Sequence, residues 1–212
     1  MKTSKPTTDK KVIVLDGATI VLRERGLQAL SFENIANQTG LSRQLIRYYY
    51  PDLERLMIDL CDHLAASYRE ILVIGVQEIG QVHRLDLFLD FFFGVNDRYP
   101  MPDNLEVYDA FFAFAVGSSE LRDRLCGVYE MLGHVFLHEL SIAHPDLQDY
   151  VCQELSFIFV SMMHAHWSYV ATLGYSDEHG RISRDALGRL IESHVVHPAP
   201  APATQQTWRR SS

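Results

Sequence analysis

The sequence predicts an all-α protein, and three observations carry this prediction. Apolar residues recur at the 3.6-residue period of a helix along almost all of the 212 residues, while the alternating patterns typical of strands are missing. Apolar residues make up 47% of the chain, which is enough to bury a sizeable core. Gly and Pro interrupt the periodic segments where turns between helices are expected.

The first expected helix covers residues 14–25. Gly26 is placed to end this helix, and the apolar residues before it fall on one face: Val14, Leu15, Ala18, Val21 and Leu22.

The next stretch predicts two short helices that cross. Ser31 is a natural N-cap for the first of them, because its hydroxyl can accept a hydrogen bond from a backbone N–H of the first turn. Ile35 points inward, and Ala36 is small enough to let the second helix cross closely. Gly40 can adopt the left-handed conformation that the sharp turn requires.

The second short helix begins after Ser42, which can cap it, and has two distinct faces. The inner face is apolar and aromatic: Leu45, Ile46, Tyr49 and Tyr50. The outer face is polar and consists of Arg43, Gln44, Arg47 and Tyr48. These residue types suit the major groove of DNA, because Arg can bond guanine, Gln can bond adenine and Tyr can reach phosphates. The alternative is an exposed helix with no role in DNA binding.

Helical periodicity returns at Leu53 and continues to the end of the last expected helix. The expected segments are 53–72, 82–98, 103–116, 119–142, 146–173 and 183–195. The expected breaks lie at Pro100 and Pro102, at 117–119, at Pro145, and at Gly174 with Gly180. The Pro- and Ala-rich end, 197–212, is expected to be a disordered tail.

Charge is distributed unevenly along the chain. The net charge is −8, but residues 1–57 contain nine Lys and Arg against six Asp and Glu, which leaves −11 on the remainder. Affinity for phosphates depends on local positive charge, so the acidic total does not exclude a nucleic-acid partner. No apolar run is long enough to span a bilayer and no signal core follows the first residues, so we expect a cytoplasmic protein without a membrane partner.

The stretch around the two short helices resembles the DNA-binding domain of the TetR family of transcriptional regulators. The resemblance covers about residues 12–60 and rests on Ile35-Ala36, on the turn 39–42, and on Tyr48–Tyr50 followed by Glu54 and Leu56. It implies an N-terminal three-helix helix-turn-helix domain over residues 1–57, ordered from about residue 10. A helical C-terminal ligand-binding and dimerisation domain would follow over residues 58–196.

The resemblance also implies which residues bind DNA: Ser31, Ser42, Arg43, Gln44, Arg47, Tyr48 and Tyr49. The two arginines of the helix and Gln44 would meet base edges. Ser31, Tyr48 and Tyr49 would hold phosphates. The family has Tyr where this chain has Arg47 and Lys where it has Leu53. Leu53 cannot grip a phosphate, and Arg47 is the candidate to restore that charge.

Aromatic residues are concentrated between about 85 and 170. Phe91, Phe92 and Phe93 cannot all face one direction, because successive helical residues are about 100° apart, so at least one is expected at a cavity or a subunit contact. The resemblance implies a cavity here for a small apolar or aromatic ligand. The candidate ligand-binding residues are Phe91, Phe92, Phe111, Phe112, His134, His138, Met163 and Trp167.

Two histidines are candidate metal ligands. His134 and His138 are one helical turn apart, with Glu139 adjacent, and could share a metal. The chain contains no H-E-x-x-H and no thiol pair, so hydrogen-bonded or pocket histidines are favoured, and no metal or cofactor is expected.

The last two apolar segments, 146–173 and 183–195, indicate a homodimer. Both have apolar residues on more than one face, which a two-fold interface satisfies better than water. In the resembling family these helices build the dimer, and two recognition helices about 34–36 Å apart demand a near-palindromic operator.

Three function classes are compatible with a helical chain of this size. The leading hypothesis is an operator-binding repressor released by a small ligand. The alternative is a DNA-binding regulator without a small-molecule effector, which a filled core around Phe91–Phe114 would favour. An α-helical enzyme is disfavoured because no G-x-S-x-G, P-loop, Rossmann or zincin motif occurs.

Overall fold

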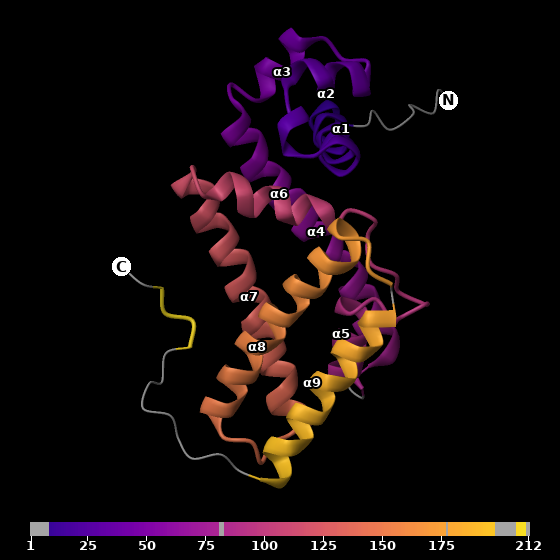
Figure 1. Ribbon diagram of the computed structural model, residues 1–212, viewed down its shortest axis with the longest axis vertical. Helices are drawn as coiled ribbons and strands as arrows, with labels where there is room; N and C mark the ends of the chain where they lie inside the picture. The colour runs from indigo at the N-terminus through magenta and orange to yellow at the C-terminus, as the bar shows by residue number, and fades with distance from the viewer. Residues whose placement is uncertain (1–8, 81–82, 177, 198–206, 211–212) are drawn as a thin grey trace, which may run out of the picture. The chain divides into compact units, whose positions relative to one another are not determined.

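The computed structural model describes residues 9–80, 83–176, 178–197 and 207–210. All regular structure within these ranges is helical, which confirms the all-α prediction. The elements, shown in Figure 1, are α1 (Lys10–Arg25), a 3-10 turn (Leu27–Ala29), α2 (Phe32–Thr39), α3 (Arg43–Tyr49), α4 (Leu53–Ile79), α5 (Arg84–Phe92), α6 (Glu106–Ala115), α7 (Ser119–Ala143), α8 (Asp149–Trp167), a π-helical turn (Ser168–Thr172) and α9 (Glu178–Val196). None of the described helices is long and apolar enough to cross a membrane.

Residue contacts divide the chain into two compact units. The N-terminal unit is the chain up to Ala66 together with Asn104–Leu125, so it includes α1, α2, α3, α6 and the first part of α4 and of α7. The C-terminal unit is Ser67–Asp103 together with the chain from Cys126 onward. Helical periodicity says nothing about which distant segments pair, so the association of α6 with the N-terminal helices comes from the structure alone.

The N-terminal unit is built around α1, which packs against α2 and α6. The inner face predicted for the first helix is confirmed, since each of its members is at most 6% exposed: Val14, Leu15, Ala18, Val21 and Leu22. Gly26, at φ 74°, ends α1 as expected, and its N–H donates to the Leu22 carbonyl at 2.9 Å.

The crossing of α1 and α2 depends on Gly17. A Cβ at this position would lie 2.2 Å from Thr39 Cγ2, so the two helices approach closely only because the side chain is absent. A glycine within a helix costs up to about 1 kcal/mol relative to alanine. The close approach gives the physical reason for Gly17 in the middle of α1.

The C-terminal unit has a core of aromatic rings. Phe136 of α7 stacks on Phe159 of α8 with ring centroids 4.3 Å apart, and Phe88 of α5 lies within 6.1 Å of both. Stacked and tilted aromatic pairs of this kind add about 0.5–1.5 kcal/mol each beyond the area they bury. The aromatic concentration seen in the sequence is therefore largely the core of this unit.

The α8–α9 pair forms a helical hairpin in which the two helices lie side by side (Figure 1). The expectation that Gly180 breaks the helix is wrong, because Gly180 lies inside α9 and is buried. A Cβ on Gly180 would lie 2.2 Å from the Phe93 carbonyl oxygen, so this glycine allows α9 to contact the end of α5. Here, too, a helical glycine marks close packing rather than a turn.

Several helix ends differ from the expected ones for identifiable reasons. α4 continues to Ile79 and ends before Gly80, and α5 stops at Phe92 shortly before Gly94; both glycines have positive φ, 71° and 67°. The end of α8 widens into a π-helical turn, in which the Leu173 N–H donates to the Ser168 carbonyl at 3.0 Å.

Part of the expected disordered tail is held on the protein. Residues 207–210 are described, and the indole N–H of Trp208 donates to Ser156 Oγ of α8 at 3.1 Å. Tail residues 198–206 and 211–212 lie outside the described residues.

Candidate nucleic-acid interface

α2 begins and ends with the two devices that its sequence predicts. Ser31 Oγ accepts a hydrogen bond from the Asn34 N–H at 3.1 Å, which confirms the N-cap. Gly40 has φ 70° and ψ 6°, the left-handed conformation, and its N–H donates to the Ala36 carbonyl at 2.9 Å. The chain can therefore turn sharply from α2 into α3.

α3 is fixed at its start by a cap and along one face by buried side chains. Ser42 Oγ accepts from the Leu45 N–H at 3.2 Å. Ile46 and Tyr50 are fully buried, while Leu45 and Tyr49 are half-buried. Anchoring this face leaves the opposite face of the helix to solvent.

Tyr50 sits in a mixed apolar and ionic environment. Burial raises the pKa of its phenol above the usual range, and the carboxylates of Asp59 and Asp9 reinforce the effect. The ammonium of Lys11 lies 5.4 Å from the ring centroid and pairs with Asp59 at 2.7 Å. These contacts tie the start of α1 to α4 and to the end of α3.

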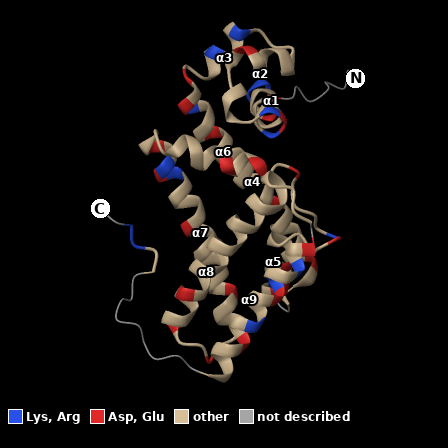
Figure 2. Cartoon of the chain, viewed as in Figure 1, with Lys and Arg blue, Asp and Glu red and all other residues tan. Residues whose placement is uncertain are grey.

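The exposed face of α3 presents the four side chains predicted to project: Arg43, Gln44, Arg47 and Tyr48. Tyr48 is 81% exposed. Figure 2 shows Lys and Arg on α3 and on α1, with acidic residues among them. The face therefore combines two guanidinium groups, an amide and a phenol on one short, capped helix, which are the donors and acceptors suited to base edges and phosphates.

Both arginines of this face have partners within the same unit. Arg43 lies 3.7 Å from Glu33 of α2, and both side chains are about two-thirds exposed, 67% and 70%. The Arg47 guanidinium lies 5.5 Å from the centre of the Phe32 ring. An ion pair this exposed contributes little in water, so a stronger acceptor can replace Glu33. Neither partner was predicted from the sequence, although Phe32 and Glu33 directly follow the Ser31 cap.

The remaining DNA-binding candidates are placed as follows. Tyr49 is half-buried, and its ring lies edge-on to that of Tyr48 with centroids 5.4 Å apart. The Ser31 hydroxyl accepts the capping bond and keeps its own proton to donate. Leu53 is the first residue of α4 and is half-buried, and Asp52 before it accepts from the Arg55 N–H at 2.8 Å. No positive side chain therefore stands at position 53.

The structure divides the ligand-binding candidates between the two units. Phe111 and Phe112 are on α6 in the N-terminal unit, with Phe111 fully buried and Phe112 44% exposed. The others belong to the C-terminal unit: Phe91, Phe92, His134, His138, Met163 and Trp167. Their role in binding a ligand stays a prediction.

Within the C-terminal unit, four of these candidates are core residues. Phe91, Phe92, Met163 and Trp167 are at most 3% exposed. Phe92 lies 5.0 Å from Phe91 and 6.0 Å from Trp167 between ring centroids, and the Trp167 indole N–H donates to the Phe92 carbonyl at 2.9 Å. A ligand bound among them would have to part rings that are in contact.

The run Phe91–Phe93 does not reach a free surface. All three side chains are at most 3% exposed, because rings of neighbouring residues cover each of them. Phe91 meets Tyr68, Phe92 meets Trp167, and Phe93 meets the rings of Phe159 and His166. The three rings therefore face different neighbouring rings of the same unit, and a cavity or subunit contact for this run stays a prediction.

The histidine candidates lie on the outside of α7. His134 and His138 are both exposed, and His134 lines a groove between α7 and α8. Among the described residues, no group of three or more His, Cys, Asp or Glu is arranged to hold a metal ion. His164 of α8 is engaged with the Tyr129 hydroxyl at 3.0 Å from its Nδ1 atom.

Comparisons with known proteins give a structural likeness only. Neither protein-family models nor curated protein sequences match the chain. A TetR transcription regulator from Haloarcula marismortui has a similar structure, with a TM-score of 0.73 and 17% identity over 88% of this chain and 98% of that one. A putative transcriptional regulator from Saccharomonospora viridis in complex with choline gives a TM-score of 0.71 and 17% identity, over 88% and 97% of the two chains.

A third similar structure is a putative TetR-family transcriptional regulator from Rhodococcus sp., with a TM-score of 0.68 and 17% identity over 88% of this chain and 98% of that one. At these identities the likeness establishes the fold. The chain has the all-helical fold of TetR-family regulators, in agreement with the resemblance of its N-terminal sequence.

Proposed function

We propose that the protein is a sequence-specific DNA-binding transcriptional regulator that acts in the cytoplasm as a homodimer on a near-palindromic operator. The observation that carries the proposal is the construction of α3. Its inner face is locked by Ile46 and Tyr50, its start is capped by Ser42, and its outer face exposes Arg43 and Gln44. The fold shared with known transcription regulators supports the same function.

In this proposal α3 enters the major groove. Arg43 gives up its exposed partner Glu33 and bonds a guanine bidentately, while Gln44 meets an adenine. Tyr48, Tyr49 and the Ser31 hydroxyl hold phosphates that set the register. Arg47 takes part from its position over Phe32 and supplies the positive charge that Leu53 lacks.

Two modes of regulation are proposed, one with a small-molecule effector that releases the DNA and one without an effector. A small organic ligand is supported by one structural neighbour, which was crystallised in complex with choline. Such a ligand would act through a coupling free energy of about 1–3 kcal/mol between its site and the DNA-binding helices. Regulation without an effector is favoured by the ring contacts of the C-terminal unit, where Phe91, Phe92 and Trp167 are packed against one another.

Binding to fragmented genomic DNA, followed by fluorescence anisotropy on the retained fragments, tests the proposal. Arg43→Ala/Gln44→Ala should weaken binding about 5- to 150-fold per lost contact, since each bidentate base contact contributes about 1–3 kcal/mol of discrimination. Arg69→Ala/Gln77→Ala is the matched control, because both residues are exposed on α4 and the charge change is the same. Equal binding by wild type and the Arg43/Gln44 variant, at about 50 mM and at about 300 mM salt, would exclude α3 as the recognition helix.

A further inference from the structure

The C-terminal residues Thr207–Arg210 lie against the side of the α7–α8 pair, in a position that the proposed function does not use. The ring of Trp208 meets that of Phe157 edge-on, with centroids 5.3 Å apart. Its indole N–H donates to Ser156 Oγ at 3.1 Å, and the Ser156 hydroxyl in turn donates to the Gln153 carbonyl at 2.8 Å. Ser156 is fully buried, so its remaining acceptor is satisfied by the indole and not by water.

α7 provides a seat for the indole at Gly133. A Cβ on Gly133 would lie 2.1 Å from Trp208 Cζ2 and 2.8 Å from two further atoms of the ring, so the indole rests directly on the helix backbone. Gly127, six residues earlier on the same helix, faces open space. Helical glycine is unfavourable by up to about 1 kcal/mol relative to alanine, and at Gly133 the contact with Trp208 gives the reason for it.

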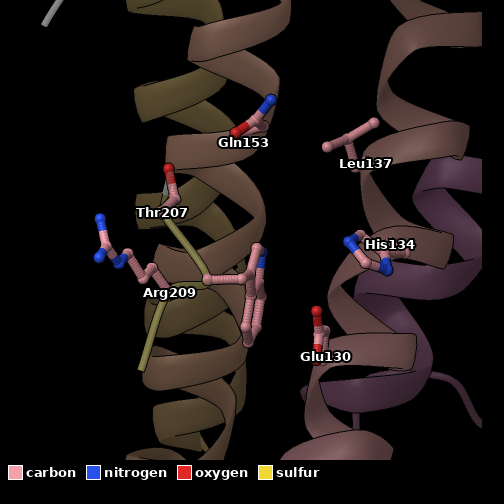
Figure 3. Close-up of a pocket in the computed structure, with 7 residues that line it drawn as sticks. Glu130, His134, Leu137, Gln153, Thr207 and Arg209 are labelled. Atoms are coloured by element: carbon pink, nitrogen blue, oxygen red, sulfur yellow. The ribbon is translucent and has the colours of Figure 1, made fainter. Parts of the chain in front are cut away.

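The groove around the indole is open on one side. Figure 3 shows Glu130, His134 and Leu137 along α7, with Thr207 and Arg209 of the C-terminal segment on the other side of the space. The groove encloses about 620 Å³ and also reaches Gln153 of α8. Trp208 is therefore a wall of this groove, held by one hydrogen bond, one ring contact and one glycine seat.

We propose that the C-terminal segment is an intramolecular latch, in which Trp208 lies against α7 and α8 of its own chain as one wall of this groove and covers part of Phe157. Phe157 is 45% exposed even with the indole in place, so removing the latch uncovers a large apolar side chain on α8. A tryptophan suits this role because it brings an apolar ring together with a single N–H that needs a partner. The occupant is this chain's own segment, and a second copy that supplies Trp208 in trans is the competing arrangement.

The test uses the full-length protein labelled with 5-fluorotryptophan and observed by ¹⁹F NMR. The chain has two tryptophans, so Trp208→Phe assigns the two resonances. In the wild type, the Trp208 resonance should lie away from its position in the urea-unfolded protein. Gly133→Ala should move it to the unfolded position without moving the resonance of Trp167, whereas Gly127→Ala, with the same gain in helix propensity, should move neither.

Whether Trp208 docks on its own chain or on a second copy is tested by complementation. Gly133→Ala chains, which keep Trp208 but lose its seat, are co-expressed with Trp208→Ala chains, which keep the seat. A latch within one chain predicts no docked Trp208 resonance in the mixture; return of the docked resonance would show that the contact is made between copies and would overturn the proposal. An unfolded-like Trp208 resonance in the wild type, or a docked one in Gly133→Ala, would overturn it as well.

Discussion

At Gly17 the absence of a side chain determines how closely α1 and α2 approach. Thr39 cannot turn its methyl group away cheaply, because its hydroxyl donates to the Ile35 carbonyl at 2.8 Å and accepts from the Leu41 N–H at 3.3 Å. The side chain is thus fixed in the rotamer that points Cγ2 at α1. One residue therefore couples the first helix to the turn that leads into α3.

This geometry makes a prediction that opposes helix propensity. Gly17→Ala should destabilise the protein by about 1–3 kcal/mol, because the new methyl group overlaps Thr39 Cγ2. Thr39→Ser removes that carbon and keeps the hydroxyl, so Gly17→Ala in the Thr39→Ser background should be neutral or stabilising by up to about 1 kcal/mol. Urea unfolding of the four proteins measures the cycle, and a stabilising Gly17→Ala in the wild-type background would contradict the close approach.

The sequence predicted the direction of individual side chains where that direction depends on a single helix. The outward residues of α3, Arg43, Gln44, Arg47 and Tyr48, follow from the helical period and from the cap at Ser42. The partners of Arg43 and Arg47 were not predicted, because Glu33 and Phe32 come close only after the Gly40 turn brings α2 beside α3. The helical period predicts which side chains point outward, whereas the partners of those side chains depend on how the helices cross.

At the scale of elements, polar contacts join the first part of α4 to the start of α7 within the N-terminal unit. Ser118 Oγ donates to the Glu54 carboxylate and accepts from the Leu121 N–H at 3.1 Å, so it also caps α7. Further along the same two helices, Arg124 of α7 donates to the Asp62 carboxylate of α4. Arg122 satisfies the end of α6 by donating to the carbonyls of Ala115 and Val116.

Ser118 should therefore contribute more than an ordinary serine at a helix start. Ser118→Ala should lower the free energy of unfolding by about 1–2 kcal/mol, because the cap is lost and the Glu54 carboxylate loses its donor. Ser119→Ala is the control, since Ser119 is exposed and should change stability by no more than about 0.5 kcal/mol. Equal effects of the two substitutions in urea unfolding would count against the cap.

Helix existence was predictable for most of the chain, and helix ends were less so. Apolar periodicity identified the long helices, and Gly26 and Gly40 were correctly assigned to turns because each follows the last periodic residue. Gly180 was assigned wrongly, because a glycine needed for close contact with the Phe93 carbonyl has the same local sequence signal as a glycine in a turn. Only the packing partner distinguishes the two.

For the whole molecule, the proposed homodimer places its interface on the hairpin of α8 and α9. The outer side of α8 exposes two small residues, Ser161 and Ala165, and Tyr169 of the π-helical turn after α8 is exposed as well. Small residues at this place allow another helix to approach within the 8–10 Å typical of packed helices. This side of α8 therefore suits contact with the same hairpin of a second copy.

Ala165→Arg should convert the dimer to a monomer, because a long charged side chain would be buried without a partner at the centre of that surface. Sedimentation velocity would report the change in mass, and affinity for the operator should fall because each monomer holds only one half-site. Gln77→Arg adds the same charge at an exposed position of α4 and should leave the mass unchanged. A dimer that persists in Ala165→Arg would place the interface elsewhere.

The central claim is that α3 reads base edges once in each half of a two-fold site. Selection of bound sequences from random duplex DNA, followed by sequencing, tests this claim most directly. If α3 reads base edges in this way, the selected sequences should form a near-palindrome with half-site centres about 10–10.5 base pairs, or a multiple of that, apart. Arg43→Ala should lose the preference for guanine at one position in each half while the rest of the sequence is retained. Recovery of the same sequence by Arg43→Ala, or of no common sequence by the wild type, would contradict it.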